Sequence, residues 1–220
     1  MKTNGDRNRR KASGWRKLTC LAVVGVLLAA AGAQAQAQDV MRVLEDWELV
    51  IGQPDAAINS PQVTTIISPL TENDAYCAFN VNYKTEGEYA EGGLQIHVWN
   101  PSSPLLIKNS SKKGVCKTLN EVVTWTMEMK LAPGVLSFKV GNGKSTTWGS
   151  FGDLGYLEAD VGTTIAHLNG YSPQTSVDSS GVSFGGNRVT SLVLKRVRKY
   201  DAAGLLISDT SPGLVAHPRQ

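Results

Sequence analysis

Apolar and polar residues alternate along most of the chain after residue 40, with a period of two rather than the three to four of a helix. Successive side chains of a strand point to opposite faces of a sheet, so each alternating segment predicts a strand with one buried face. Strands are predicted over residues 43–51, 62–67, 76–83, 94–99, 122–131, 135–140, 145–148 and 188–200, with turns at Pro133-Gly134 and Gly141-Asn142-Gly143.

Many short strands with few helical stretches predict an all-β fold, a two-sheet antiparallel β-sandwich of the jelly-roll kind. One short helical turn is expected over Thr163–Leu168. The sandwich domain is predicted to span residues 38–205. Residues 206–220 contain two prolines and no repeating pattern, so we expect a loosely ordered C-terminal tail.

The first 37 residues have the pattern of a secretory signal peptide. Residues 1–17 are strongly basic, residues 18–31 form a short apolar run, and the Ala-x-Ala sites Ala33–Ala35 and Ala35–Ala37 follow. We predict cleavage after Ala35 or Ala37 and a secreted, periplasmic or cell-envelope location, with no membrane span after cleavage. The alternative is an uncleaved anchor, which would also leave the domain outside the membrane.

Removing this leader reverses the sign of the net charge. The leader holds seven of the 22 Lys and Arg residues and one of the 19 acids, which leaves 15 basic and 18 acidic residues. The remaining domain therefore gives no reason to expect a nucleic-acid partner. Its one basic run, over Lys195–Lys199, is interpreted as a solvated or edge strand.

Two cysteines, Cys77 and Cys116, remain after cleavage. An even number of cysteines in an oxidising compartment predicts one disulfide between them. The alternative is a pair of unbonded structural thiols.

Two segments of the chain resemble the concanavalin A-like superfamily of lectins and glucanases, including its laminin-G-like members. The first strand Glu45–Val50 and the closing segment Gly181–Val189, which leads into Tyr200, are similar to the first and last strands of those domains. The turns from Pro133-Gly134 to Asn142-Gly143 are similar as well. The resemblance implies a two-sheet sandwich in which the first and last strands are neighbours, and a sheet face that binds glycans.

The polar faces of two predicted strands are the candidate for such a face. Gln95, His97 and Trp99 project opposite apolar residues, and Asn80 and Asn82 do the same on the preceding strand. Aromatic rings stack on sugar rings, and amides and imidazoles bond to hydroxyls. The alternative is a face that is solvated, or covered by residues 100–120. The candidate carbohydrate-binding residues are Asn80, Asn82, Gln95, His97, Trp99 and Trp148.

No catalytic residue is assigned from the sequence. Asp46 and Glu48 share a strand face about 6.6 Å apart, which is compatible with an inverting glycosidase pair. An outer strand at the start of the domain favours a solvated face instead. The histidines are widely spaced, so no metal site or cofactor is expected. A calcium ion held by backbone carbonyls would leave no mark in the sequence.

The sequence thus favours an exported, non-catalytic, lectin-like β-sandwich whose partner is a glycan or polysaccharide. One alternative is a glycoside hydrolase or lyase of the same fold. The other is a structural or adhesive cell-envelope protein.

Overall fold

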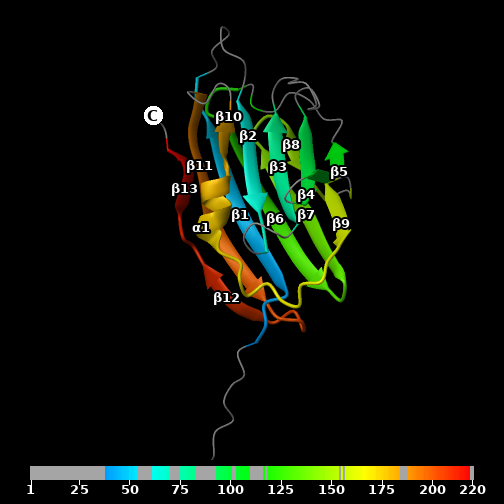
Figure 1. The fold of residues 1–220 in the computed structure, drawn as a ribbon. Helices are drawn as coiled ribbons and strands as arrows, with labels where there is room; N and C mark the ends of the chain where they lie inside the picture. The colour runs from blue at the N-terminus through cyan, green and yellow to red at the C-terminus, as the bar shows by residue number, and fades with distance from the viewer. Residues whose placement is uncertain are drawn as a thin grey trace, which may run out of the picture. The chain divides into compact units, whose positions relative to one another are not determined.

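The computed structural model describes residues 38–53, 61–69, 75–82, 93–100, 103–109, 116, 118–153, 155, 157–183 and 188–218. The predicted signal peptide lies outside these residues. Within them the chain forms two antiparallel sheets and one short helix, which confirms the predicted all-β sandwich (Figure 1).

The larger sheet has eight strands in the order β12-β11-β1-β6-β7-β8, with β13 also on β11 and β9 also on β7. The smaller sheet has five in the order β10-β2-β3-β4-β5. The larger sheet contains β1 (Arg42–Ile51), β6 (Val122–Ala132), β7 (Val135–Ser145), β8 (Gly149–Phe151), β9 (Glu158–Gly162), β11 (Val189–Tyr200), β12 (Leu206–Thr210) and β13 (Leu214–Pro218). The smaller contains β2 (Gln62–Ile67), β3 (Tyr76–Asn82), β4 (Leu94–Asn100), β5 (Ser103–Asn109) and β10 (Gly181–Ser183).

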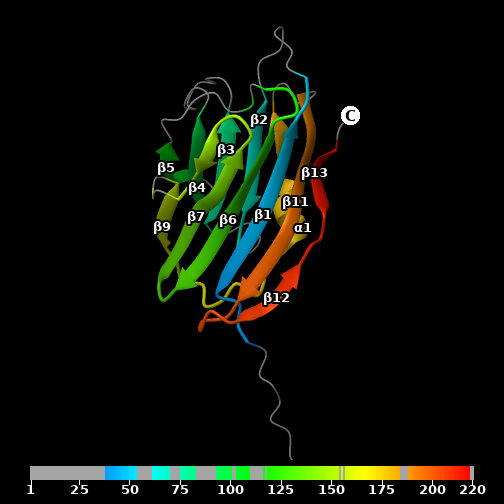
Figure 2. The ribbon, with the colours of Figure 1, turned by 180° about the vertical axis from the view of Figure 1, so that it is seen from behind.

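The first strand lies in the middle of the larger sheet. It pairs along its whole length with β11 on one side and over residues 42–50 with β6 on the other, both antiparallel (Figure 2). This confirms the expectation that the first strand and the long strand near the C-terminus are neighbours.

The core lies between the inner faces of the two sheets, and the alternation predicted from the sequence decides which side chains enter it. Trp47 and Trp125, directly opposite each other on β1 and β6, are 1% and 2% exposed. The Trp125 ring meets the edge of Phe79 from β3, with ring centroids 5.4 Å apart. Thr65 on β2 donates a hydrogen bond to the sulfur of Met127 on β6.

The carboxylate of Glu45 is fully buried on the inner face of β1. Its oxygens accept hydrogen bonds from the Tyr171 hydroxyl at 2.6 Å and from the Trp47 indole N–H at 2.9 Å. Tyr171 precedes helix α1 (Pro173–Ser179), which lies against β2 and β13 at one side of the sandwich. Burial raises the pKa of Glu45 to about 7, although bonds from Ser176, Tyr171 and Trp47 oppose the rise.

Three local predictions were wrong. Thr163–Leu168 has no helix, and the helix begins instead at Pro173, whose fixed φ suits the first helical turn. Gly141-Asn142-Gly143 is not a turn but continues β7. Residues 206–218 are not loosely ordered, because β12 and β13 both pair with β11. The two prolines do not interrupt these strands, because Pro212 lies between β12 and β13 and Pro218 is the last residue of β13.

The predicted disulfide was also wrong, because Cys77 and Cys116 are both free and buried. Cys77 is on β3 in the smaller sheet, between Ile67 and Val98. Cys116 has φ 65°, and its carbonyl accepts a bond from Arg188 just before β11 in the larger sheet. Burial raises the pKa of both thiols, which keeps them protonated and unreactive.

The buried Glu45 makes stability fall as pH rises. The unfolded chain releases this proton near pH 4.5, whereas the folded chain keeps it up to about pH 7. The contribution of this proton to the free energy of unfolding is fully present below pH 4.5 and is lost as the pH rises through 7. The total change is on the order of 3 kcal/mol. We expect Glu45→Gln to remove this part of the pH dependence.

The measurement is the free energy of urea unfolding at several values between pH 4.5 and 8, compared between wild type and variant. Glu48→Gln, on the outer face of the same strand, is the control and should keep the wild-type slope. Equal slopes for Glu45→Gln and wild type would contradict the assignment of the buried proton to Glu45.

Candidate functional site

The polar face predicted on β3 and β4 is not an open patch. Leu94, Ile96 and Val98 are fully buried, as the alternation requires, and Trp99 is partly exposed. However, Asn80, Gln95 and His97 are each only 2% exposed. The Asn80 amide oxygen accepts a bond from Thr64 Oγ1, and the His97 ring lies 5.8 Å from the Trp99 ring. The side chain of Asn82 lies outside the described residues.

Trp148 lies on the other sheet, between β7 and β8. Its ring stacks on Phe151 with centroids 5.0 Å apart, and Phe151 in turn stacks on Phe79 at 6.3 Å. Trp148 is therefore the partly buried outer member of a row of aromatic rings that enters the core. The structure does not bring Trp148 onto the β3–β4 face.

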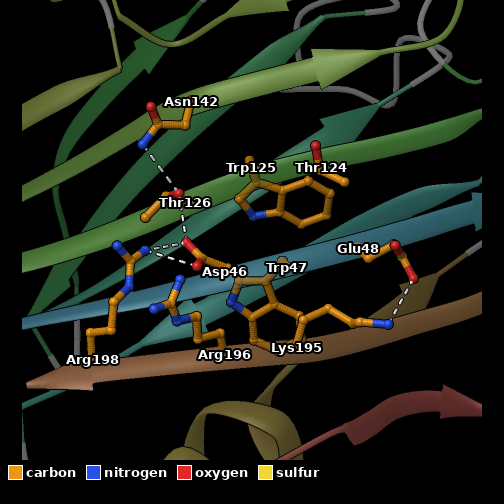
Figure 3. Close-up of a pocket in the computed structure, with 10 residues that line it drawn as sticks. All are labelled: Asp46, Trp47, Glu48, Thr124, Trp125, Thr126, Asn142, Lys195, Arg196 and Arg198. Atoms are coloured by element: carbon orange, nitrogen blue, oxygen red, sulfur yellow. Dashed lines mark hydrogen bonds and ion pairs between the residues drawn. The ribbon is translucent and has the colours of Figure 1, made fainter. Parts of the chain in front are cut away.

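A hollow of about 480 Å³ lies on the outer face of the larger sheet, where β11, β1, β6 and β7 run side by side (Figure 3). Asp46 and Glu48 of β1 and Thr124 and Thr126 of β6 point outward into it. It is lined by Asp46, Trp47, Glu48, Thr124, Trp125, Thr126, Asn142, Lys195, Arg196 and Arg198, and we call it the outer hollow.

Two β-bulges lie on either side of the outer hollow. On β7, Asn142 and Gly143 oppose the single residue Trp125, and Asn142 takes a left-handed φ of 51°. On β11, Lys195 is the extra residue opposite the Asp46–Trp47 step. Bulges redirect side chains and are common beside functional sites. Here they turn Asn142, Lys195 and Arg196 toward the hollow.

Asp153 stabilises the bulge on β7 by hydrogen bonding to its backbone. Both carboxylate oxygens of Asp153 accept bonds from the Asn142 backbone N–H, at 3.1 and 3.2 Å. The Asn142 side chain then donates to Thr126 Oγ1 at 3.3 Å, and Thr126 donates to Asp46 at 2.8 Å.

Ion pairs fix the charged side chains of the hollow. Arg198 donates to both oxygens of Asp46 at 2.7 and 2.8 Å, and Lys195 lies 3.2 Å from Glu48. Arg196 makes two bonds to Asp209 on β12, which hold the pKa of that carboxyl below its usual range. The prediction of an edge strand was wrong, because β12 pairs with residues 197–200 of β11 and β13 with residues 191–194. The solvated alternative is confirmed for Lys195 and Arg196, whose side chains are exposed.

These side chains suit polyhydroxylated ligands. Each of Asp46, Asn142 and Arg198 presents two polar atoms in one plane, and sugar hydroxyls both donate and accept. Ion pairs that already hold the side chains in position lower the entropy lost on binding. The indoles of Trp47 and Trp125 point into the core, on the side of the sheet away from the outer hollow. Among the described residues the hollow therefore offers little aromatic surface for stacking.

Some residues of the outer hollow were noted in the sequence, but they were not predicted to form one site. Asp46 and Glu48 were identified as sharing a face, and the basic run was noted. Asn142 was missed because Gly-Asn-Gly was interpreted as a turn. Glycine and asparagine occur in β-bulges as well as in turns. The strand pattern that continues on both sides of Gly141–Gly143 was the signal that could have distinguished a bulge from a turn.

No protein-family model matches the chain, and no curated protein matches it. In the described part of the chain, no helix is long and apolar enough to cross a membrane. Across the same residues, no group of three or more His, Cys, Asp or Glu side chains could hold a metal ion.

Two substitutions at Asn142 separate its backbone role from its side-chain role. Asn142→Ala should lower the free energy of unfolding by about 1–2 kcal/mol, because a left-handed φ is sterically unfavourable for alanine, whereas asparagine tolerates it through local hydrogen bonds of its short side chain. Asn142→Gly should cost less, because glycine adopts this conformation freely. Thermal unfolding of both variants measures the difference. A glycine variant as destabilised as the alanine variant would show that φ is not the constraint.

Proposed function

We propose that this protein is an exported, non-catalytic carbohydrate-binding β-sandwich, and that its glycan site is the outer hollow rather than the β3–β4 face. The observation that supports this most is the pair of β-bulges that bring Asn142, Lys195 and Arg196 into the lining of the outer hollow. Together the bulges gather polar side chains around one open hollow. Export rests on the basic, apolar and Ala-x-Ala pattern of residues 1–37.

The two-sheet architecture is the one implied by the resemblance to concanavalin A-like domains, and the proposal adopts that class. We place the site elsewhere than predicted because Asn80, Gln95 and His97, the three predicted polar residues with described side chains, are all buried. A buried amide or imidazole cannot reach a ligand without rearrangement, whereas Asn142 and Arg196 are exposed.

A glycoside hydrolase is the second candidate, because Asp46 and Glu48 both line the outer hollow. Hydrolysis needs one carboxyl group placed to protonate the leaving group. Asp46 and Glu48 instead each form an ion pair, Asp46 with Arg198 and Glu48 with Lys195, so neither carboxyl is free to reach a leaving group. This arrangement supports binding over hydrolysis.

Affinity electrophoresis through gels containing β-glucan, xylan or mannan tests the proposal. We expect wild type to be retarded by at least one polysaccharide, and Asn142→Gly to weaken that binding about tenfold, the value of one or two lost hydrogen bonds. The melting temperature of this variant should stay close to wild type.

Trp99→Ala is the matched control for the alternative site on β4, and should leave retardation unchanged. Retardation that is lost in Trp99→Ala and kept in Asn142→Gly would move the site back to β4. Absence of retardation in every gel would favour a structural or adhesive role. Reducing ends released by wild type but not by Glu48→Gln would favour the hydrolase.

A further inference from the structure

A second, smaller hollow adjoins the outer hollow on the same sheet face. It has a volume of about 70 Å³, and the two hollows share Thr126 and Asn142 in their walls. We call it the side hollow. It is lined by Arg42, Leu44, Thr126, Glu128, Lys139, Gly141, Asn142 and Asp153.

The two hollows lie one after the other along the strands of this face. On β1 the outer hollow is lined by residues 46–48, and the side hollow by Arg42 and Leu44. Together they form a track that follows β1 from Glu48 to Arg42, with β6 and β7 beside it (Figure 2). Six residues at about 3.3 Å each make the track about 20 Å long. This length exceeds one sugar ring, and Thr126 and Asn142 lie where two units would join.

Every cation that lines either hollow already has its own carboxylate. In the outer hollow these pairs are Lys195–Glu48, Arg196–Asp209 and Arg198–Asp46. In the side hollow Arg42 lies 2.7 Å from Glu128, and Lys139 lies 2.6 Å from Glu158.

One further carboxylate, Asp153, lines the side hollow without a cation of its own among these pairs and binds the Asn142 backbone instead. An acidic chain would therefore have to break existing ion pairs and lie beside Asp153. An uncharged chain would bond to the same groups without displacing any of them.

We infer that the ligand of this face is an uncharged, linear glycan of at least two sugar units, lying along the strands with one unit in each hollow. This inference rests on the proposed function and specifies its substrate class. The outer hollow binds one unit through Asp46, Arg198 and Asn142. The side hollow binds the next, with Lys139 at its rim and Leu44 as an apolar contact.

Calorimetric titration of the full-length protein tests chain length and charge together. The probes are cello-, xylo- and manno-oligosaccharides of one to six units, and oligogalacturonates of the same lengths as charged counterparts. We expect affinity to rise at least about tenfold from one unit to four in one neutral series. Oligogalacturonates should bind at least about tenfold more weakly, and added salt should change neutral binding little.

Lys139→Gln probes the side hollow alone. Its pair with Glu158 is half exposed, so the fold should be unaffected. We expect about threefold to tenfold weaker binding of four-unit chains and unchanged binding of single sugars. Lys130→Gln is the control, because Lys130 is an exposed lysine of β6 that lines neither hollow.

The outcomes separate this inference from the proposed function. Equal affinity for one and six units, or no effect of Lys139→Gln on four-unit chains, would overturn the two-unit site while leaving glycan binding intact. Tighter binding of oligogalacturonates, weakened by salt, would overturn the uncharged class. Binding of no oligosaccharide at any length would overturn the proposed function itself.

Discussion

The structure depends on the register of β1 between β6 and β11. Alternation along this one strand sends Glu45 and Trp47 into the core and Asp46 and Glu48 onto the outer face. A slip of one residue would expose the first pair and bury the second, so both the core and the hollow fix the same register. The bonds from Tyr171 and Trp47 to Glu45 add a constraint, because a buried carboxylate is tolerated only where donors meet it.

The candidate site is a consequence of that arrangement and of the two bulges around it. The strands β1 and β6 supply regular outward positions, Asp46 and Thr126, while β7 and β11 each contain an irregularity that adds side chains to them. The bulge on β7 also requires glycine at position 143, because a Cβ there would lie 2.2 Å from the Phe151 ring. The close approach of Phe151 joins the bulge to the aromatic row that ends in the core at Trp125.

Period-two alternation was enough to predict the two-sheet sandwich and the buried face of each predicted strand. The pairing of the first strand with residues 188–200 was implied by the resemblance to concanavalin A-like domains. Alternation was not enough to locate the binding site. It indicates on which face of the sheet a side chain lies, but not whether that face is covered. Gln95 and His97 were placed on the correct side of β4, yet that side is buried. Asn142 depends on a register shift between β6 and β7, which two distant segments determine together and local sequence cannot show.

The location of the glycan site is the central claim, and nuclear magnetic resonance tests it most directly. Amide chemical shifts of the ¹⁵N-labelled protein are followed while a neutral oligosaccharide is added. We expect the largest changes to cluster at Asp46, Thr126, Asn142 and Arg198, on four adjacent strands of the larger sheet. Changes that cluster around His97 and Trp99 on β4, with those four amides unmoved, would contradict it.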